Sequence, residues 1–217
     1  MDAATWDLIR TERLTLADLL EVLDDGQWQT RSLCTEWSVQ EVAAHLLMTP
    51  AGQPRPWAMA KALARARGHL WTAGRDVAIA YGRRPRAELV SGLRAHAASR
   101  TKPVFVADAN ILLDLLVHGQ DIAVPLGVDR EVHPAAGRAA LERIWSMGWP
   151  FHTRRRLEGV RLCAEDGSWQ AGDGPEVRGP AAALLLLTTG RTAAALPLLD
   201  GPGLPVLQRR LAPTGRG

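Results

Sequence analysis

Cysteine is scarce in this sequence, as are long apolar runs. The two cysteines, Cys34 and Cys163, have neither the paired spacing of a zinc knuckle nor the density of a disulfide-stapled secreted scaffold, so we expect two small buried side chains. The longest apolar run, residues 181–187, is too short to cross a bilayer, and the first residues lack the basic start and apolar core of a leader. These absences predict a cytoplasmic protein with no membrane partner.

An excess of charge of one sign is also missing. The formal charge of +3 comes from 26 basic and 23 acidic side chains, which are spread along the chain and not gathered into a patch. Because nucleic-acid binding relies on concentrated basic surface, we expect no nucleic-acid partner. With 47% hydrophobic residues, the 217 residues suffice for one large core or two modest domains, in a monomer or a homodimer.

The spacing of apolar residues changes from a helical period to a strand period near residue 150. Helical spacing is found in residues 9–23, 39–46, 57–68, 86–99, 111–122 and 135–147. After residue 150 come short alternating segments at 159–164, 169–171 and 176–178, with a hairpin turn at 166–167 and an apolar helix at 181–189. We therefore predict a mainly α protein with a helical bundle at residues 1–150 and a small α+β domain at residues 151–217. The arginines at 154–156 are expected on a solvated strand edge.

The most apolar helix of the bundle carries an acid and an imidazole one turn apart. Asp114, His118 and Asp121 fall on one stripe of the segment 111–122, whose other faces are apolar. Burying an ionisable group costs several kcal/mol unless it is paired or binds a metal. Asp114 and His118 therefore need each other, a cation or a solvent-filled pocket.

A third candidate ligand, His45, lies at the margin of the apolar stripe of the second helix. If this helix neighbours the one at 111–122, His45, Asp114 and His118 supply two imidazoles and one carboxylate, a ligand set that leaves a coordination position open. Zn²⁺ suits such a set best, and iron or nickel suits it less well. Outer partners for the imidazoles are available by spacing at Asp121, Gln120 and Glu41.

A purely structural interpretation of the same residues stands beside the metal site. Asp114 and His118 can form a hydrogen-bonded pair, and His45 can be an ordinary core histidine. The other histidines lie in polar or loop contexts and are expected at the surface; they are His69, His96, His133 and His152. Most of the eight tryptophans are expected to pack at bundle ends, although one could line a pocket.

Three blocks of residues resemble a known family. They are residues 12–20 through Trp28 to 32–46, residues 113–122 with 125–127, and residues 159–162 through Asp166, Trp169 and 172–179 to 190–191. In this order they resemble the mycothiol-dependent maleylpyruvate isomerase family of actinobacteria. The resemblance implies a DinB-like four-helix bundle followed by a small α+β domain.

The resemblance also implies roles for individual residues. His45, Asp114 and His118 match the metal ligands of the family, whose isomerase has a glutamate in place of Asp114. Arg191 matches an arginine of the smaller domain that assists catalysis. The implied chemistry is a metal-activated thiolate of mycothiol that adds to an electrophilic small molecule, in isomerisation or in thiol S-transfer. In isomerisation, addition to a cis double bond allows rotation, and elimination then returns the trans product.

Two other functions are compatible with the residues. A diverged family member could bind a metal or small ligand without catalysis, because a fold does not fix a function. Residues 37–46 also resemble the first helix of a helix-turn-helix DNA-binding motif. The prolines at 50, 54 and 56 interrupt the place where a recognition helix should follow, which argues against this second alternative.

Overall fold

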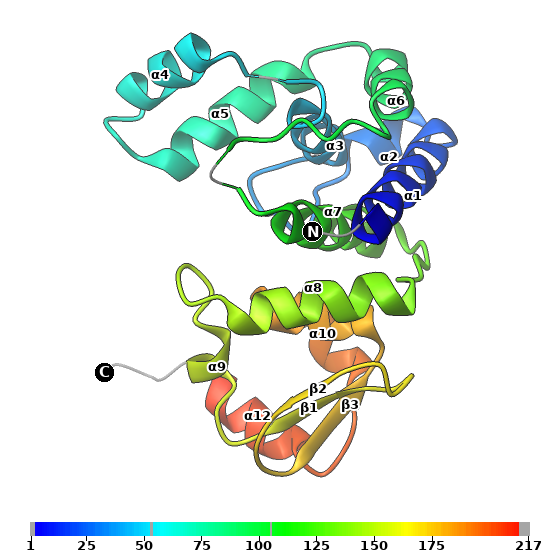
Figure 1. Ribbon diagram of the computed structural model, residues 1–217, viewed down its shortest axis with the longest axis vertical. Coiled ribbons are helices and arrows are strands. Elements are labelled where there is room, and N and C mark those ends of the chain that lie inside the picture. The colour runs from blue at the N-terminus through cyan, green and yellow to red at the C-terminus, as the bar shows by residue number, and fades with distance from the viewer. Residues whose placement is uncertain (1–2, 53, 105, 213–217) are drawn as a thin grey trace. The chain divides into compact units, whose positions relative to one another are not determined.

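The computed structural model describes residues 3–52, 54–104 and 106–212 and divides into two compact units, residues 1–130 and 131–217 (Figure 1). The first unit is helical, and the second joins helices to a small sheet. The mainly α class predicted from the sequence, with an α+β carboxyl-terminal part, is confirmed. Within the described residues, no helix combines the length and the apolar character that crossing a membrane requires.

Four helices of the first unit form a closed ring. Helix α1 packs against α6 and α7, and α3 packs against the same two helices. This arrangement makes α3 and α7 neighbours, as the sequence-based metal site required. Helix α5 covers α3, and α4 packs against α5. The bounds are α1 Ala3–Glu21, α2 Asp25–Gln29, α3 Val39–Met48, α4 Pro56–Arg65, α5 Leu70–Gly82, α6 Arg86–Ala95, α7 Asp108–Ala123 and the 3₁₀ helix η1 Val124–Leu126.

Helix α5 is an element that the sequence analysis did not predict. Its glycines weaken the intrinsic helix propensity, so packing against α3 must contribute much of its stability. The packing also explains Gly82 at its end, because a Cβ there would lie 3.3 Å from the Glu41 side chain on α3. The glycine at this position therefore permits close approach of the two helices.

A buried arginine ties α1 to the segment that follows α6. The Nη1 atom of Arg13 donates to the carbonyl oxygens of His96, Ala97 and Ser99 at 3.3, 3.0 and 2.7 Å. Burial lowers the pKa of Arg13 to about 10, so the guanidinium stays charged near neutral pH. A single side chain thus satisfies carbonyl groups at the end of α6.

The second unit is built around a three-stranded sheet in the order β2-β1-β3. Strand β1 pairs antiparallel with β2 and parallel with β3, and α10 packs against β1 and α8. Helix α8, which lies before residue 150, is therefore part of this compact unit. The bounds are α8 Pro134–Ser146, α9 Thr153–Arg156, β1 Arg161–Ala164, β2 Gln170–Gly172, β3 Glu176–Gly179, α10 Ala181–Thr188, α11 Thr192–Ala195, the 3₁₀ helix η2 Leu196–Leu198 and α12 Leu204–Leu211.

The arginines at 154–156 do not form a strand edge, so that prediction is wrong. They lie in α9, and Arg156 donates from Nη1 to the carbonyl oxygen of Thr188 at 3.1 Å, at the end of α10. Carbonyl groups at a helix end have no intrahelical partners and attract cations. This nonlocal contact cannot be read from a run of like charges.

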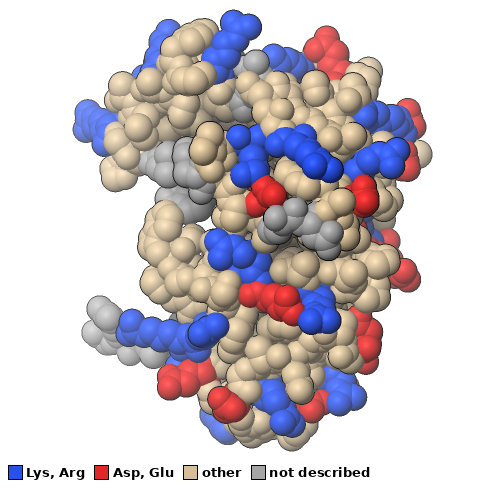
Figure 2. Space-filling view, in the orientation of Figure 1, with Lys and Arg blue, Asp and Glu red and all other residues tan. Residues whose placement is uncertain are grey.

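Basic and acidic side chains are interspersed over the face drawn in Figure 2.

An ion pair with little solvent access joins α1 to the end of the first unit. Arg130 Nη2 donates to Glu12 Oε2 at 2.6 Å, and both side chains are 8% exposed. The absence of a side chain at Gly119 leaves room for this arginine, because a Cβ there would lie 2.7 Å from Arg130 Nε. Loss of one partner leaves the other charge buried.

Replacing Arg130 with methionine is expected to lower the free energy of unfolding by about 3–5 kcal/mol, because Glu12 then stays buried without its cation. Urea unfolding followed by tryptophan fluorescence measures the change. The control is Arg138→Ala, which breaks the exposed pair with Glu142 on α8 and is expected to cost about 0.3–0.5 kcal/mol. Equal effects of the two substitutions would contradict the assignment of Glu12–Arg130 as a stabilising buried pair.

Candidate metal centre

The structure brings His45, Asp114 and His118 together. Helix α3 carries His45 in its last turn, and α7 carries Asp114 and His118 one turn apart on one face. His45 Nε2 lies 3.2 Å from Asp114 Oδ2, and His118 Nε2 lies 3.4 Å from Asp114 Oδ1. One ligand atom from each side chain falls within 4.8 Å of the others. The aspartate therefore stands between two imidazole nitrogens.

Solvent reaches this cluster from the side of the aspartate. The Asp114 side chain is 45% exposed, whereas that of His118 is 13% exposed. Within one turn, α7 thus passes from a solvent-accessible carboxylate to a nearly buried imidazole. Water therefore reaches Asp114 without any movement of the helices.

The electrostatics favour the charged form of each partner. Burial alone would raise the pKa of Asp114, but the imidazoles of His45 and His118 hold it well below its usual range. Burial alone would lower the pKa of His118, but the carboxylates of Asp114 and Asp121 raise it well above its usual value. The cluster is therefore a strong site for a cation, which is a proton in the absence of a metal.

Asp121 is the outer partner of His118. Its Oδ2 accepts from His118 Nδ1 at 2.8 Å, and its side chain is fully buried. This bond turns Nε2 of the ring toward Asp114 and fixes the ring orientation. The two other outer partners suggested by spacing have different roles: Glu41 caps α3 through Ser38, and Gln120 donates to the carbonyl oxygen of Arg130.

Cys34 is a residue of this region that the sequence analysis missed. It was expected to be a buried apolar side chain, but it is half-buried and its Sγ donates to Asp121 Oδ2 at 3.1 Å. Cys163 does follow the expectation and is buried in β1. The position of Cys34 depends on a loop that packs against α7, and no local pattern in the sequence marks such packing.

Trp37 is the tryptophan that lies at the site. Its ring centroid is 5.0 Å from that of His45 and 5.9 Å from that of His118. The Nε1 atom is buried and has no hydrogen-bond partner in the part of the chain that the structure describes. A buried donor without an acceptor is costly, so this N–H is available to a group that the polypeptide does not supply.

The remaining predicted residues lie elsewhere. Arg191 belongs to the second unit, where it precedes α11 and donates from Nη1 to the carbonyl oxygen of Thr189 at 3.1 Å. The four histidines expected at the surface are all exposed, as predicted: His69, His96, His133 and His152. His133 additionally caps α8 by accepting from the backbone N–H of Ala135.

Comparison with known proteins identifies the family. The family described as "Mycothiol maleylpyruvate isomerase N-terminal domain" matches residues 9–123, which is more than half of the chain. The chain belongs to this family. The matched residues of this mycothiol maleylpyruvate isomerase family member include the three clustered side chains as well as Cys34 and Asp121, whereas Arg191 lies outside the match.

Solved structures extend the likeness over both units. The crystal structure of the mycothiol-dependent maleylpyruvate isomerase has 17% identity and a TM-score of 0.59, and the match covers 92% of each chain. A histidine-to-alanine mutant of it has 16% identity, with the same TM-score and coverage. At this identity the likeness shows a shared fold. No curated protein matches the chain.

Replacing Asp121 with asparagine is expected to weaken metal binding by about 10–100-fold, because the amide no longer fixes the orientation and basicity of His118. Zn²⁺ affinity can be measured by competition with a chromophoric chelator. The control is Glu41→Ala, which removes the cap of α3 and is expected to cost about 1 kcal/mol of stability while leaving Zn²⁺ affinity unchanged. An unchanged affinity in Asp121→Asn would contradict the positioning role.

Proposed function

We propose that the chain is a cytoplasmic, metal-dependent enzyme that uses mycothiol and activates its thiol for addition to an electrophilic small molecule. The reaction is either isomerisation, as in a maleylpyruvate isomerase, or thiol S-transfer. Membership of the mycothiol maleylpyruvate isomerase family supports the choice of thiol. The observation that carries the proposal is the convergence of His45, Asp114 and His118 from two helices.

These side chains fit a divalent ion such as Zn²⁺. Around a tetrahedral ion with bonds of about 2.0–2.1 Å, neighbouring ligand atoms lie about 3.3–3.4 Å apart. His45 Nε2 lies 3.2 Å from Oδ2 of Asp114 and His118 Nε2 lies 3.4 Å from its Oδ1, so each imidazole has about this spacing from a different oxygen of the same carboxylate. The unsatisfied N–H of Trp37 supports a different part of the proposal, an anionic group bound beside the cluster, since an anion can accept from it.

The protein groups prepare this site for an anionic thiolate. When bound, a divalent ion with an open position would lower the pKa of a thiol that joins it, so that the thiolate exists near neutral pH. The proposed ligands contribute one negative charge, that of Asp114, so they leave a divalent charge only partly neutralised. Asp121 holds His118 in place, and the exposure of Asp114 gives a thiol access.

Arg191 is the residue that we propose for substrate activation. A guanidinium presents a planar pair of donors that can bind a substrate carboxylate or an enolate oxygen through two parallel hydrogen bonds. Donors of this kind stabilise the negative charge that develops after thiolate addition. The resemblance of the segment around Arg191 to the family, which implies a catalytic arginine at this position, supports this role.

A non-catalytic family member that binds a metal or small ligand is the alternative function, because the same donors would serve it. Turnover of an electrophile by metal-loaded protein distinguishes the two. The helix-turn-helix alternative gains no support: most residues of α3 are buried, and α4, which follows it, packs against α5. No mobility shift of duplex DNA is therefore expected at low salt.

His118→Ala is expected to remove the bound metal, and His45→Ala is expected to empty the site that it shares with Asp114 and His118, because two remaining ligands do not hold a divalent ion with comparable affinity. Metal content after purification without chelator gives the first measurement, and turnover of a maleyl-type electrophile with and without mycothiol gives the second. Metal content is expected to fall to background in His118→Ala, and turnover is expected to fall to background in both variants.

The control is His69→Ala, which changes an exposed histidine of the same unit and is expected to retain metal and turnover. Full metal content in His118→Ala, or unchanged turnover in His45→Ala, would refute the assigned ligands. Full metal content with no turnover in the unmodified protein, across electrophiles and with mycothiol present, would favour the non-catalytic alternative.

Arg191→Lys is expected to lower kcat by about 10²–10³-fold at unchanged metal content, because an ammonium keeps the charge but loses the paired donors. Steady-state kinetics on metal-loaded protein measures the loss. Arg209→Ala, at an exposed position of α12, provides the comparison and should leave kcat unchanged. A normal kcat in Arg191→Lys would exclude a role for its paired donors.

A further inference from the structure

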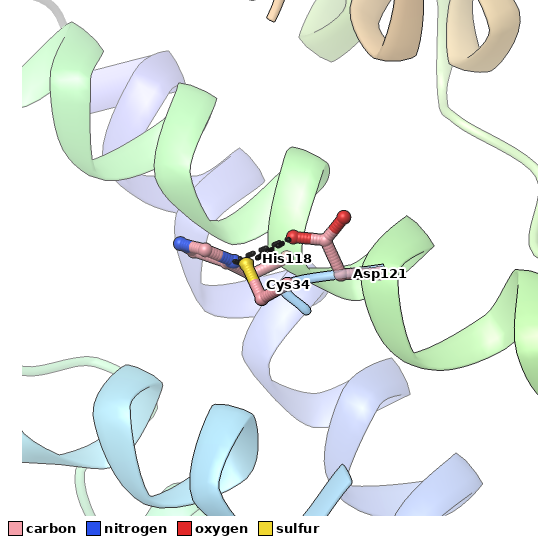
Figure 3. Close-up of side chains that lie close together, drawn as sticks. All are labelled: Cys34, His118 and Asp121. Carbon is pink, nitrogen blue, oxygen red and sulfur yellow. Dashed lines mark hydrogen bonds and ion pairs between the residues drawn. The ribbon is translucent and has the colours of Figure 1, made fainter. Parts of the chain in front are cut away.

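The Nδ1 atom of His118, which faces away from Asp114, lies beside further atoms that can bind a metal. Figure 3 shows Cys34 and Asp121 at one end of the ring, while the other ring nitrogen points away from them. Cys34 Sγ lies 3.6 Å from His118 Nδ1 and 3.1 Å from Asp121 Oδ2, and Nδ1 lies 2.8 Å from the same oxygen. One sulfur, one nitrogen and one oxygen thus converge without using His45 or Asp114.

The loop that carries Cys34 is held in place by main-chain and side-chain bonds. The backbone N–H of Leu33 donates to the carbonyl oxygen of Asp121 at 3.1 Å, which fixes the loop to α7. Ser32 Oγ accepts from the backbone N–H of Cys34 at 3.1 Å, and the backbone N–H of Trp37 donates to the carbonyl oxygen of Cys34 at 2.8 Å. The thiol is therefore presented to His118 and Asp121 by an ordered backbone.

The separations of these atoms approach those of a bound ion. With bonds of about 2.3 Å to sulfur and about 2.0–2.1 Å to nitrogen and oxygen, a tetrahedral ion places its ligands about 3.3–3.6 Å apart. The sulfur-to-nitrogen separation already meets this value. The oxygen of Asp121 lies closer because it accepts hydrogen bonds from both neighbours, and it must move by a few tenths of an ångström.

We propose that Cys34, His118 and Asp121 form a second metal site, selective for thiophilic divalent ions such as Cd²⁺ and Zn²⁺. Sulfur ligands favour such ions over Mg²⁺ or Ca²⁺. A thiolate and a carboxylate together balance the charge of a divalent ion, which suits a site where the Asp121 side chain has no solvent exposure. The half-buried thiol of Cys34 provides the way in.

Binding at the second site exchanges protons for the ion. The S–H bond of Cys34 breaks and the N–H bond at Nδ1 of His118 breaks, both protons go to solvent, and the thiolate and the freed Nδ1 lone pair bind the ion. The ring then keeps its N–H at Nε2, where Asp114 Oδ1 lies 3.4 Å away to accept it. A neutral His118 ring cannot ligate through both nitrogens, so the two sites are alternatives.

Titration with Co²⁺ and Cd²⁺ tests this proposal on the full chain. A thiolate-to-metal charge-transfer band is expected in the unmodified protein and in Cys163→Ser, whose substitution removes the other thiol. The band is expected to disappear in Cys34→Ser and Cys34→Ala. Cd²⁺ affinity should fall in both variants. The fall should exceed the loss of about 10–100-fold that accompanies removal of an outer partner.

His45→Ala separates this proposal from the proposed function. That substitution removes a ligand of the first site only, so the charge-transfer band is expected to remain. A band that persists in both Cys34 variants, or that is absent from the unmodified protein, overturns the second site whatever the turnover measurements give. Cd²⁺ is also expected to protect Cys34 of the unmodified protein from an alkylating reagent. Mass spectrometry can map this protection, and the measurement requires no variant to fold.

Discussion

The buried carboxylate of Asp121 is the constraint on which the site depends. It accepts from the imidazole of His118 and from the thiol of Cys34, and its backbone carbonyl accepts from Leu33. A carboxylate without solvent access costs several kcal/mol unless such donors surround it. These hydrogen bonds hold the loop of Cys34 against α7 and fix the orientation of the His118 ring. The position of Nε2 of His118 therefore depends on Asp121, which bonds to the opposite side of the ring.

The ring of four helices supplies the second requirement, which is a fixed distance between α3 and α7. Helix α3 packs against α6 and α7, and α7 packs against α1 and α3, so neither can slide without disturbing two interfaces. Arg13 and the Glu12–Arg130 pair add polar ties between α1 and distant parts of the unit. The bundle thereby holds His45 opposite Asp114 with side chains that do not touch the site.

The sequence was sufficient to predict the parts of the site that follow from helical periodicity. Asp114 and His118 share a face because they are one turn apart, and the helical spacing of residues 39–46 located the helix of His45. Cys34 could not be found in this way, because its role arises from a loop packed on a helix far along the chain. The prediction for the arginines at 154–156 was wrong for the same reason: the carbonyl groups that Arg156 meets belong to α10, and periodicity contains no information on such contacts.

The exposure of Asp114 has a consequence for how long an ion would stay. A carboxylate with 45% of its side chain in water can exchange its partner for solvent without any helix opening. Release of the ion would therefore be governed by ligand exchange and not by unfolding. A centre of this kind equilibrates with the surrounding medium, and the identity of its ion reflects the supply of each metal as much as the preference of the protein.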